Sequence, residues 1–320
     1  MRVLVLGAGA VGGYFGGRLV EAGTADVTFL VRPARKAAID RDGLVIESPV
    51  GNFRGPVQAI TEDALRPGWD IVLLTAKAYD LDSAIAAIRP GVDEQTAVLP
   101  FLNGMSHIEV LQGAFGKERV LGGLAQIQAT LAPDGTVRHL AKLAAIQFGE
   151  FDGSFSARVK ALEAAYAGTS VQAKALPDIA GALWAKLVFL GSMAATTVLM
   201  RANVGEVRAA PGGEAWINRL IERNAAIAAA NGHPVPDALM DYYRNFARDN
   251  PGAAASMLRD LESGGRIEAD HILGYLLAAA RRAGVEDTLH EAAYIHAKAY
   301  EARRAAARLP GPGSVTPPAA

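Results

Sequence analysis

Apolar and polar positions along the first half of the chain follow the pattern of a parallel sheet flanked by helices. Short apolar runs predict strands at 2–6, 26–31, 44–47, 71–76, 97–100, 120–130, 137–140 and 144–148. Apolar residues at three- and four-residue spacing predict intervening helices, for example at 11–22, 80–88 and 106–114. The run from Ile71 to Thr75 is almost wholly apolar, which is typical of a strand buried on both faces. We therefore predict a doubly wound α/β sheet, with a hairpin around Pro133-Asp134-Gly135 closing its edge.

The pattern changes near Pro177, after a predicted helix at 155–168 and a short strand at 170–174. Beyond it, helical spacing predicts helices at 179–200, 213–231, 236–248, 253–263, 266–283 and 287–306. We predict an α/β domain at 1–176, an all-helical domain at 177–308 and a disordered, Pro- and Gly-rich tail at 309–320. Ligands bind at the carboxyl ends of the strands in such sheets, so we expect the active site in the cleft between the two domains.

A glycine-rich turn, Gly7-Ala8-Gly9-Ala10-Val11-Gly12, joins the first apolar run to a helical pattern. This strand–turn–helix context is the one that a Rossmann dinucleotide-binding fingerprint requires. Gly7 would allow the tight turn, Gly9 the approach of the pyrophosphate, and Gly12 close packing of helix on strand. The helix N-terminus would then face the phosphates. The chain has 34 glycines, so a chance match without a ligand is the alternative.

The end of the second predicted strand bears on which dinucleotide binds. NAD sites usually place an acidic residue there, but this strand is followed by Arg32-Pro-Ala-Arg35-Lys36. A guanidinium suits a 2′-phosphate because its planar fork can bind two oxygens at once. We predict NADPH as the cofactor, with Arg32 as its first ligand and Arg35 or Lys36 in support; a solvated basic turn is the alternative.

Composition narrows the function classes. The 320 residues are 51% hydrophobic and 20% charged, with a formal net charge of −1, so nothing indicates nucleic-acid binding. There are no cysteines, which excludes disulfides and thiolate chemistry and fits a cytoplasmic protein. No uninterrupted apolar stretch reaches the roughly 18 residues of a membrane span. The six histidines form no metal-binding pattern, and we expect no metal.

Four polar residues are candidates for chemistry. Lys77 and Asn103 each follow a predicted strand, although polar residues often end buried strands and position alone decides nothing. Lys186 stands among largely apolar neighbours, where burial would lower its pKa. The pattern alone favours a lysine with a buried stem and a solvated head. Glu268 begins a predicted helix, where an acid is favoured simply by the helix dipole.

Taken together, these segments resemble the ketopantoate reductase (2-dehydropantoate 2-reductase) family over nearly the whole chain. The matching segments, in order after the glycine motif, are Thr75-Ala-Lys77-Ala, Asn103-Gly104-Met105, Leu183-Trp184-Ala-Lys186, Gly205-Glu206-Val-Arg, Ser256-Met257-Leu-x-Asp260 and Gly265-Arg266-Ile-Glu268-Ala-Asp270. The family reduces the ketone of a 2-keto acid with NADPH, in pantothenate biosynthesis for ketopantoate itself. The resemblance therefore implies a small 2-keto acid as substrate.

The resemblance also implies a role for each matched residue. Lys186 corresponds to the general acid that gives a proton to the carbonyl oxygen, and Glu268 to the acid that binds the substrate hydroxyl and helps to hold that lysine. Asn103 lies near the nicotinamide and substrate in the family, Lys77 lines the same cleft, and Ser256 contacts the substrate carboxylate. Arg32 falls near the arginine that binds the 2′-phosphate.

One departure separates this chain from the biosynthetic enzymes, which typically carry asparagines at three substrate-binding positions. Those positions hold Leu190, Ala194 and Val204 here. Loss of amide contacts to a substrate hydroxyl can change specificity by roughly 10⁴–10⁵. We expect retained cofactor chemistry with a different substrate, for example a 2-keto acid with a more apolar side chain.

Two alternatives stay open at this stage. An opine or 3-hydroxyacid dehydrogenase shares this architecture, although the combination of Lys186 and Glu268 favours a ketopantoate-type reductase. A catalytically silent NADP(H) sensor is the reading from another class of function. The apolar helices of the second domain would also be compatible with a homodimer.

Overall fold

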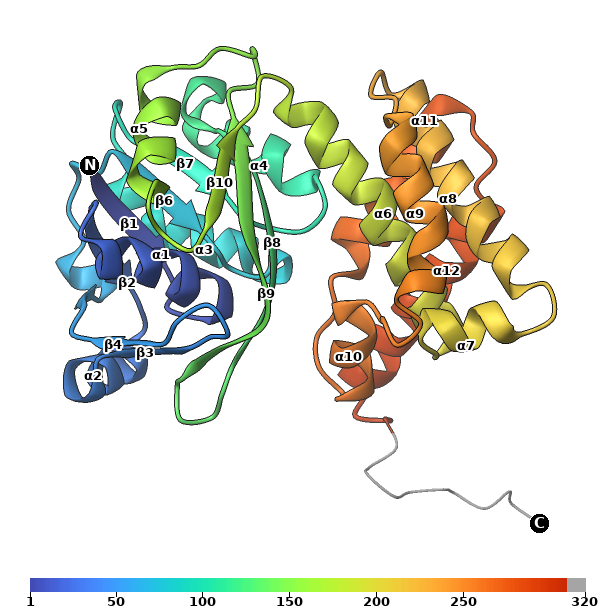
Figure 1. Ribbon diagram of the computed structural model, residues 1–320, viewed down its shortest axis with the longest axis horizontal. Coiled ribbons are helices and arrows are strands. Elements are labelled where there is room, and N and C mark those ends of the chain that lie inside the picture. The colour runs from blue at the N-terminus through green and yellow to red at the C-terminus, as the bar shows by residue number, and fades with distance from the viewer. Residues whose placement is uncertain (310–320) are drawn as a thin grey trace. The chain divides into compact units, whose positions relative to one another are not determined.

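The computed structural model describes residues 1–309 of the chain. Two compact units make up the protein, Met1–Leu183 and the segment from Trp184 onward, and they divide within helix α6 (Ile179–Met200). Figure 1 shows the first unit in blue to green and the helices of the second in yellow to red. Of the tail expected at 309–320, all but Leu309 lies outside the described residues.

The first unit contains the predicted parallel sheet (Figure 1). Its strands lie in the order β5-β2-β1-β6-β7 and every neighbouring pair is parallel. The strands are β1 (Arg2–Leu6), β2 (Asp26–Leu30), β5 (Gln58–Ile60), β6 (Ile71–Leu74) and β7 (Ala97–Pro100). This order, with its reversal beside β1, confirms the doubly wound α/β prediction.

Both faces of this sheet are buried, which explains why its strands are almost wholly apolar. Val3 points into one hydrophobic core and its neighbour Leu4 into the other, and neither has exposed surface. Helices α3 (Leu81–Ile88) and α4 (Ser106–Phe115) contribute to the core that contains Leu4. Helix α1 (Ala10–Ala22) contributes to the other core.

The predicted hairpin forms, but it does not close the edge of the first sheet. It belongs to a second sheet with the order β10-β9-β3-β4, to which β8 is added by pairing with β9. The strands are β3 (Leu44–Glu47), β4 (Phe53–Gly55), β8 (Gly122–Leu131), β9 (Val137–Gly149) and β10 (Gln172–Ala175). The two short strands expected at 137–140 and 144–148 are the single strand β9, because a register shift in β8 between Ile127 and Ala129 keeps the long pair aligned.

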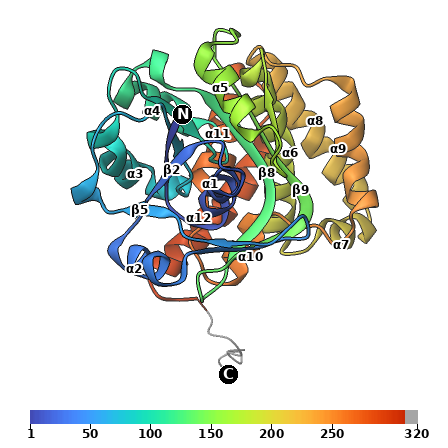
Figure 2. The same cartoon turned by 60° about the vertical axis from the view of Figure 1, so that its left-hand side comes forward.

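Helix α1 packs against both sheets, and its glycines make this possible. A Cβ atom on Gly16 would lie 2.8 Å from the ring of Phe29 on the first sheet. A Cβ on Gly17 would lie 2.6 Å from Ile46 on the second sheet. Figure 2 shows the long β8–β9 hairpin curving past α1, which contacts both of its strands. The hydrophobic pattern of α1 does not indicate that this helix packs on two sheets.

The pattern also missed the helix α2 (Pro33–Asp42). Only Ile39 is buried in this helix, so its apolar face is too narrow to produce a helical signal. Helix α5 (Ala157–Tyr166) forms close to the predicted place. The strands β4 and β5 escaped notice because each has three residues.

The second unit is helical throughout its described residues. After α6, the structure contains α7 (Val204–Ala209), α8 (Gly213–Ala230), α9 (Asp237–Asp249), α10 (Ser256–Glu262), a π-helix (Asp270–Gly274), α11 (Tyr275–Ala283) and α12 (Thr288–Ala305). By length and composition α6 could cross a membrane, but 67% of its most apolar window is buried, as in the core helix of a globular domain.

A buried polar network joins three of these helices. The amide of Asn224 on α8 donates to Oγ of Ser192 on α6 at 2.7 Å, and that hydroxyl donates to the carbonyl of Val188 at 2.7 Å. Nε2 of His290 on α12 lies 2.6 Å from Oδ1 of Asn224. The oxygen of the amide therefore faces the ring, so Nε2 carries the proton. Burial lowers the pKa of His290 and favours this neutral form.

Candidate active site

The glycine motif forms a tight turn between β1 and α1. Gly7 has φ +89°, a backbone conformation that residues other than glycine rarely adopt. A Cβ on Gly12 would overlap the carbonyl oxygen of Gly7 and lie 2.5 Å from Oγ1 of Thr75. That hydroxyl donates to the carbonyl of Leu6 at 2.8 Å, which fixes the end of β1. Gly7 and Gly12 are thus required by the turn itself.

Gly9 has a different setting. It is the N-cap of α1, and a Cβ placed there would meet nothing within 4 Å. No side chain of the described residues caps the helix, and its first turn, which begins with Ala10 and Val11, contains no acidic residue. Open space in front of uncapped N–H groups and a positive helix end fits a phosphate. The loop, including the buried Ala8, is therefore suited to hold a dinucleotide pyrophosphate.

The strand register brings the other predicted cofactor residues to the same edge of the sheet. Leu6 pairs in register with Leu30 on one side and with Leu74 on the other, and Leu74 pairs with Pro100. The segments that follow these four residues therefore begin side by side. They contain the glycine turn, Arg32, Lys77 and Asn103 respectively.

The three cations after β2 have different surroundings. Arg32, the N-cap of α2, is exposed, and its side chain makes no hydrogen bond or ion pair within residues 1–309. Lys36 pairs with Asp40 at 2.6 Å. Arg35 donates to two backbone carbonyls and is partly buried. Arg35 and Lys36 thus each have partners within the chain, whereas Arg32 has none among residues 1–309.

Lys77 and Asn103 lie in the loops after β6 and β7. Lys77 is exposed and directly precedes a short 3₁₀ helix, Ala78–Asp80. Asn103 is half-buried beside Gly104, whose φ of +82° turns the chain into α4. Within the part of the chain that the structure describes, the Asn103 amide has no hydrogen-bond partner, so it is available to a ligand.

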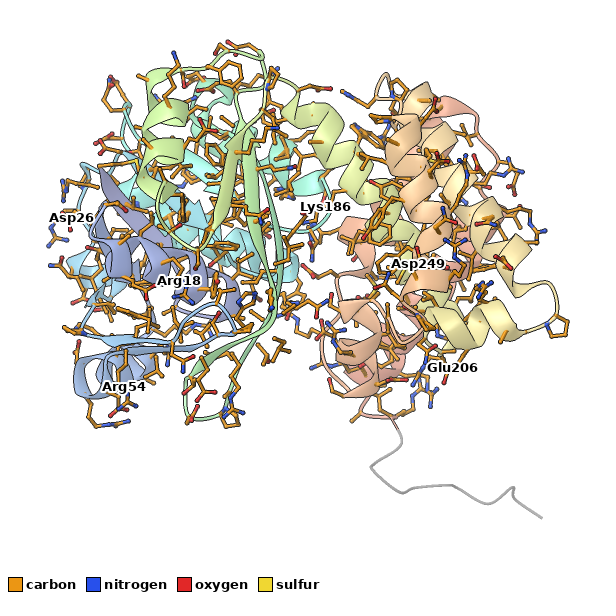
Figure 3. All side chains as sticks on the ribbon, in the orientation of Figure 1. Arg18, Asp26, Arg54, Lys186, Glu206 and Asp249 are labelled. Carbon is orange, nitrogen blue, oxygen red and sulfur yellow. The ribbon has the colours of Figure 1, made fainter. Side chains whose placement is uncertain are left out.

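Lys186 lies on α6 in the helical unit (Figure 3). It interacts electrostatically with Glu268, although the two residues are far apart in the sequence. Burial of the ammonium lowers the pKa of Lys186 to about 8, and the Glu268 carboxylate partly opposes this shift. Glu268 is 5% exposed and lies just before the π-helix, where its carbonyl accepts from the N–H of Ile272 at 3.2 Å. A lysine that titrates near neutral pH is suited to proton transfer.

Other features are less informative about chemistry. Ser256 is half-buried as the first residue of α10. Within residues 1–309, no three His, Asp or Glu side chains gather as a metal site. A cavity of about 160 Å³ opens beside Arg35, which is the one predicted cofactor residue in its lining. The lining is formed by Arg35, Ala38, Asp42, Gly43, Val45, Arg54, Asp134, Gly135 and Thr136.

Comparison with known protein families matches two models in chain order. Residues 3–153 match "Ketopantoate reductase PanE/ApbA", and residues 178–301 match "Ketopantoate reductase PanE/ApbA C terminal". The chain belongs to the ketopantoate reductase family. This is a family of oxidoreductases, as the resemblance predicted.

Individual relatives cover nearly the full length. The chain is 35% identical to "Uncharacterized oxidoreductase YkpB" of Bacillus subtilis over 95% of this chain and 100% of that protein. It is 27% identical to the 2-dehydropantoate 2-reductase of Halobacterium salinarum over 88% and 92% of the two chains.

Several solved structures share the fold. A PanE/ApbA family ketopantoate reductase from Ralstonia eutropha superposes with a TM-score of 0.86 at 27% identity, covering 95% of this chain and 100% of that one. D-mandelate dehydrogenase in a ternary structure with NADH and anilino(oxo)acetate has a TM-score of 0.84 at 19% identity, over 95% and 100% of the two chains. At that identity the likeness concerns the fold alone.

The positions at which this ketopantoate reductase family member lacks asparagine differ in accessibility. Leu190 lies one helical turn after Lys186 and is half-buried, so it has surface that a ligand can reach. Ala194 and Val204 have no exposed surface. Ala194 and Val204 are thus packed into the helical unit, and Leu190 is the departure that bears most directly on substrate contact.

Thr75 and Arg35 have structural roles around the glycine turn that were not predicted from the sequence. Thr75 fixes β1 through a bond to the Leu6 carbonyl, and Arg35 reaches the carbonyl of Ala8. Both contacts join segments that are distant in sequence, and no local pattern signals them.

Proposed function

We propose that this protein is an NADPH-dependent reductase that converts a 2-keto acid to the 2-hydroxy acid. The observation that carries the proposal is the desolvated Lys186 beside the buried Glu268, in a family of oxidoreductases. An ammonium whose pKa is about 8 holds its proton at neutral pH and releases it readily. The glycine turn supports the cofactor part of the proposal, because its geometry fits a pyrophosphate.

Lys186, Glu268 and Ser256 have different roles in this proposed reaction. When bound, NADPH would supply the hydride for the carbonyl carbon, and negative charge would then develop on the carbonyl oxygen. Lys186 stabilises that charge and gives its Nζ proton to the oxygen, so that the hydroxyl forms and the lysine becomes neutral. Glu268 binds the developing hydroxyl and keeps the ammonium oriented, and Ser256 binds the substrate carboxylate.

Different residues of the first unit bind different parts of the dinucleotide. Gly9 and the N-terminus of α1 bind the pyrophosphate, and Arg32 binds the 2′-phosphate through its planar guanidinium. Lys77 and Asn103 contact the nicotinamide end, where Asn103 also orients the substrate. Arg32 is exposed and has no partner within residues 1–309, which supports a preference for NADPH over NADH.

The proposed substrate is a 2-keto acid with a more apolar side chain than that of ketopantoate. Leu190 supports this choice, since it presents an alkyl group where the biosynthetic enzymes place an amide. The anilino(oxo)acetate bound by D-mandelate dehydrogenase suggests including aromatic 2-keto acids among the candidates. A role in pantothenate biosynthesis, in the cytoplasm, would follow if ketopantoate itself were the best substrate.

The test is the initial rate of NADPH oxidation with ketopantoate, pyruvate, branched-chain and aromatic 2-keto acids. NADH serves as the cofactor control. Lys186→Ala should lower kcat by about 10²–10⁴-fold with unchanged NADPH affinity. Lys174→Ala, at an exposed lysine of β10, is the matched control and should leave the rate unchanged. Cofactor binding without turnover of any acid would overturn the proposal in favour of an NADP(H) sensor.

A further inference from the structure

We infer that Arg35 is a positioning residue that clamps the glycine turn to the β8–β9 turn, and that it does not bind the 2′-phosphate. The inference rests on the proposed NADP(H) site. Nη2 of Arg35 donates to the carbonyl of Ala8 at 3.0 Å and to the carbonyl of Gly135 at 2.9 Å. One guanidinium nitrogen thus connects α2 to two loops that are remote in sequence.

The hydrogen-bond inventory of Arg35 excludes a bidentate phosphate contact. Nη2 has two hydrogens, and both are directed at the carbonyls of Ala8 and Gly135. Nε is buried and has no partner within residues 1–309, so it too is closed to a ligand. Only Nη1 is left as a donor, whereas a bidentate contact with a phosphate needs donors on two adjacent nitrogens. Arg32 differs in being exposed with all its donors unused by the described residues.

The β8–β9 turn is shaped to receive this side chain. Gly135 has φ +85°, and a Cβ atom there would overlap Nη1 of Arg35. Thr136 is held by a bond from its N–H to Asp134 at 2.9 Å, which keeps the turn closed. The carbonyl of Gly135 therefore points at Arg35 only while this residue is a glycine.

The clamp acts on the part of the cofactor site that NADPH and NADH share. Ala8 lies between Gly7 and Gly9 and is 3% exposed, so a fixed Ala8 carbonyl fixes the peptide planes that would face the pyrophosphate. Loss of the clamp loosens the turn for both dinucleotides alike. Loss of a 2′-phosphate ligand affects NADPH alone.

The experiment compares dissociation constants for NADPH and NADH, measured by fluorescence titration of the full chain. Arg35→Met should weaken both cofactors by the same factor, about tenfold for the loss of roughly 1.4 kcal/mol of preorganisation. Arg32→Gln should weaken NADPH by at least that factor and leave NADH unchanged. Arg35→Lys keeps a charged donor and should recover part of the loss for both cofactors.

A second pair of variants tests the clamp from its other end. Gly135→Ala should reproduce the equal weakening, because the new Cβ displaces Arg35. Gly168→Ala is the matched control: its φ of +84° imposes the same backbone strain, but nothing lies within 4 Å of the new Cβ. It should leave both dissociation constants unchanged.

Three outcomes overturn the inference. If Arg35→Met weakened the binding of NADPH alone, Arg35 would be identified as a ligand of the 2′-phosphate. Folded Arg35→Met or Gly135→Ala protein with wild-type affinities would show that the clamp does not support the turn. Wild-type protein that binds neither dinucleotide would overturn the proposed function itself, and the clamp's role with it.

Discussion

Nε2 of His290 lies 2.6 Å from Oδ1 of Asn224, and both side chains are buried. Asn224→Ala removes the hydrogen-bond acceptor of His290. It also removes the amide N–H that donates to Oγ of Ser192. A buried polar group left without its partner costs about 1–3 kcal/mol, so we expect a loss of about 2–4 kcal/mol in the free energy of unfolding. Urea unfolding of the variant and the wild type measures this loss.

The control for this variant is Asn245→Ala, whose amide only donates to the carbonyl of Asp241 one turn back. It should change the free energy of unfolding by no more than about 0.5 kcal/mol. Equal losses in the two variants would contradict the assignment of a stabilising buried network.

Gly9 and Gly12 should respond differently to the same substitution. Gly9→Ala adds a methyl group in open space, so stability should be unchanged while NADPH affinity falls by about tenfold or more. Gly12→Ala overlaps the Gly7 carbonyl and should cost about 1–3 kcal/mol of stability. Thermal unfolding and cofactor titration separate the two effects. Wild-type affinity in Gly9→Ala would argue against a pyrophosphate at this turn.

The rate of ketone reduction should fall as the pH rises through about 8. Burial lowers the pKa of Lys186 to about 8, and the general acid must carry its proton before the reaction. The protonated fraction is nearly complete at pH 7 and about one tenth at pH 9. A profile of kcat/KM between pH 6 and 10, at saturating NADPH, measures this limb. A flat profile across that range would contradict Lys186 as the acid.

Glu268→Gln should move that limb to lower pH. The carboxylate raises the pKa of Lys186 against the effect of burial, so its removal lets the pKa fall further. The proton would then leave Lys186 at a lower pH than in the wild type. Glu262→Gln, at an exposed glutamate 4.0 Å from Arg201, is the control and should keep the wild-type limb. If the alkaline fall in kcat/KM moved to higher pH in Glu268→Gln, the conclusion that Glu268 raises the pKa of Lys186 would be wrong.

Leu190→Asn should shift specificity toward ketopantoate. The residue is half-buried, so an amide there can reach a ligand without being sealed in the core. One hydrogen bond to a substrate hydroxyl is worth about 0.5–1.5 kcal/mol, or roughly two- to tenfold in kcat/KM relative to pyruvate. Ala194→Asn, in fully buried surroundings, should instead reduce stability. An unchanged ratio in Leu190→Asn would mean that this position does not contact the substrate.

Local patterns predicted much of the fold because its strands are buried on both faces and its helices have broad apolar sides. The strand from 71 and the helix at 179–200 are examples, and the glycine turn has the geometry its motif requires. Lys186 and Glu268 became candidates through a family resemblance, since their residue types alone favoured a solvated lysine and a helix-end acid. Their interaction depends on tertiary packing.

The features that sequence reasoning missed are long-range ones. The contact between Arg35 and Gly135 joins segments 100 residues apart in the sequence, and Arg35 has no local pattern that distinguishes it from Arg32. The placement of the β8–β9 hairpin in a second sheet depends on pairing with β3. Periodicity specifies that a strand exists, but not which strand lies beside it.

The path of the chain through the two sheets bears on how the first unit folds. The chain leaves the first sheet after β2, gives β3 and β4 to the second sheet, and returns to the first for β5. Gly17 of α1 packs on β3, which pairs with the much later strand β9. A fragment ending before β8 would contain the whole glycine motif and all five strands of the first sheet, yet expose one side of α1 to water. The setting of the motif therefore depends on pairings between strands that are distant in sequence, and such pairings slow folding.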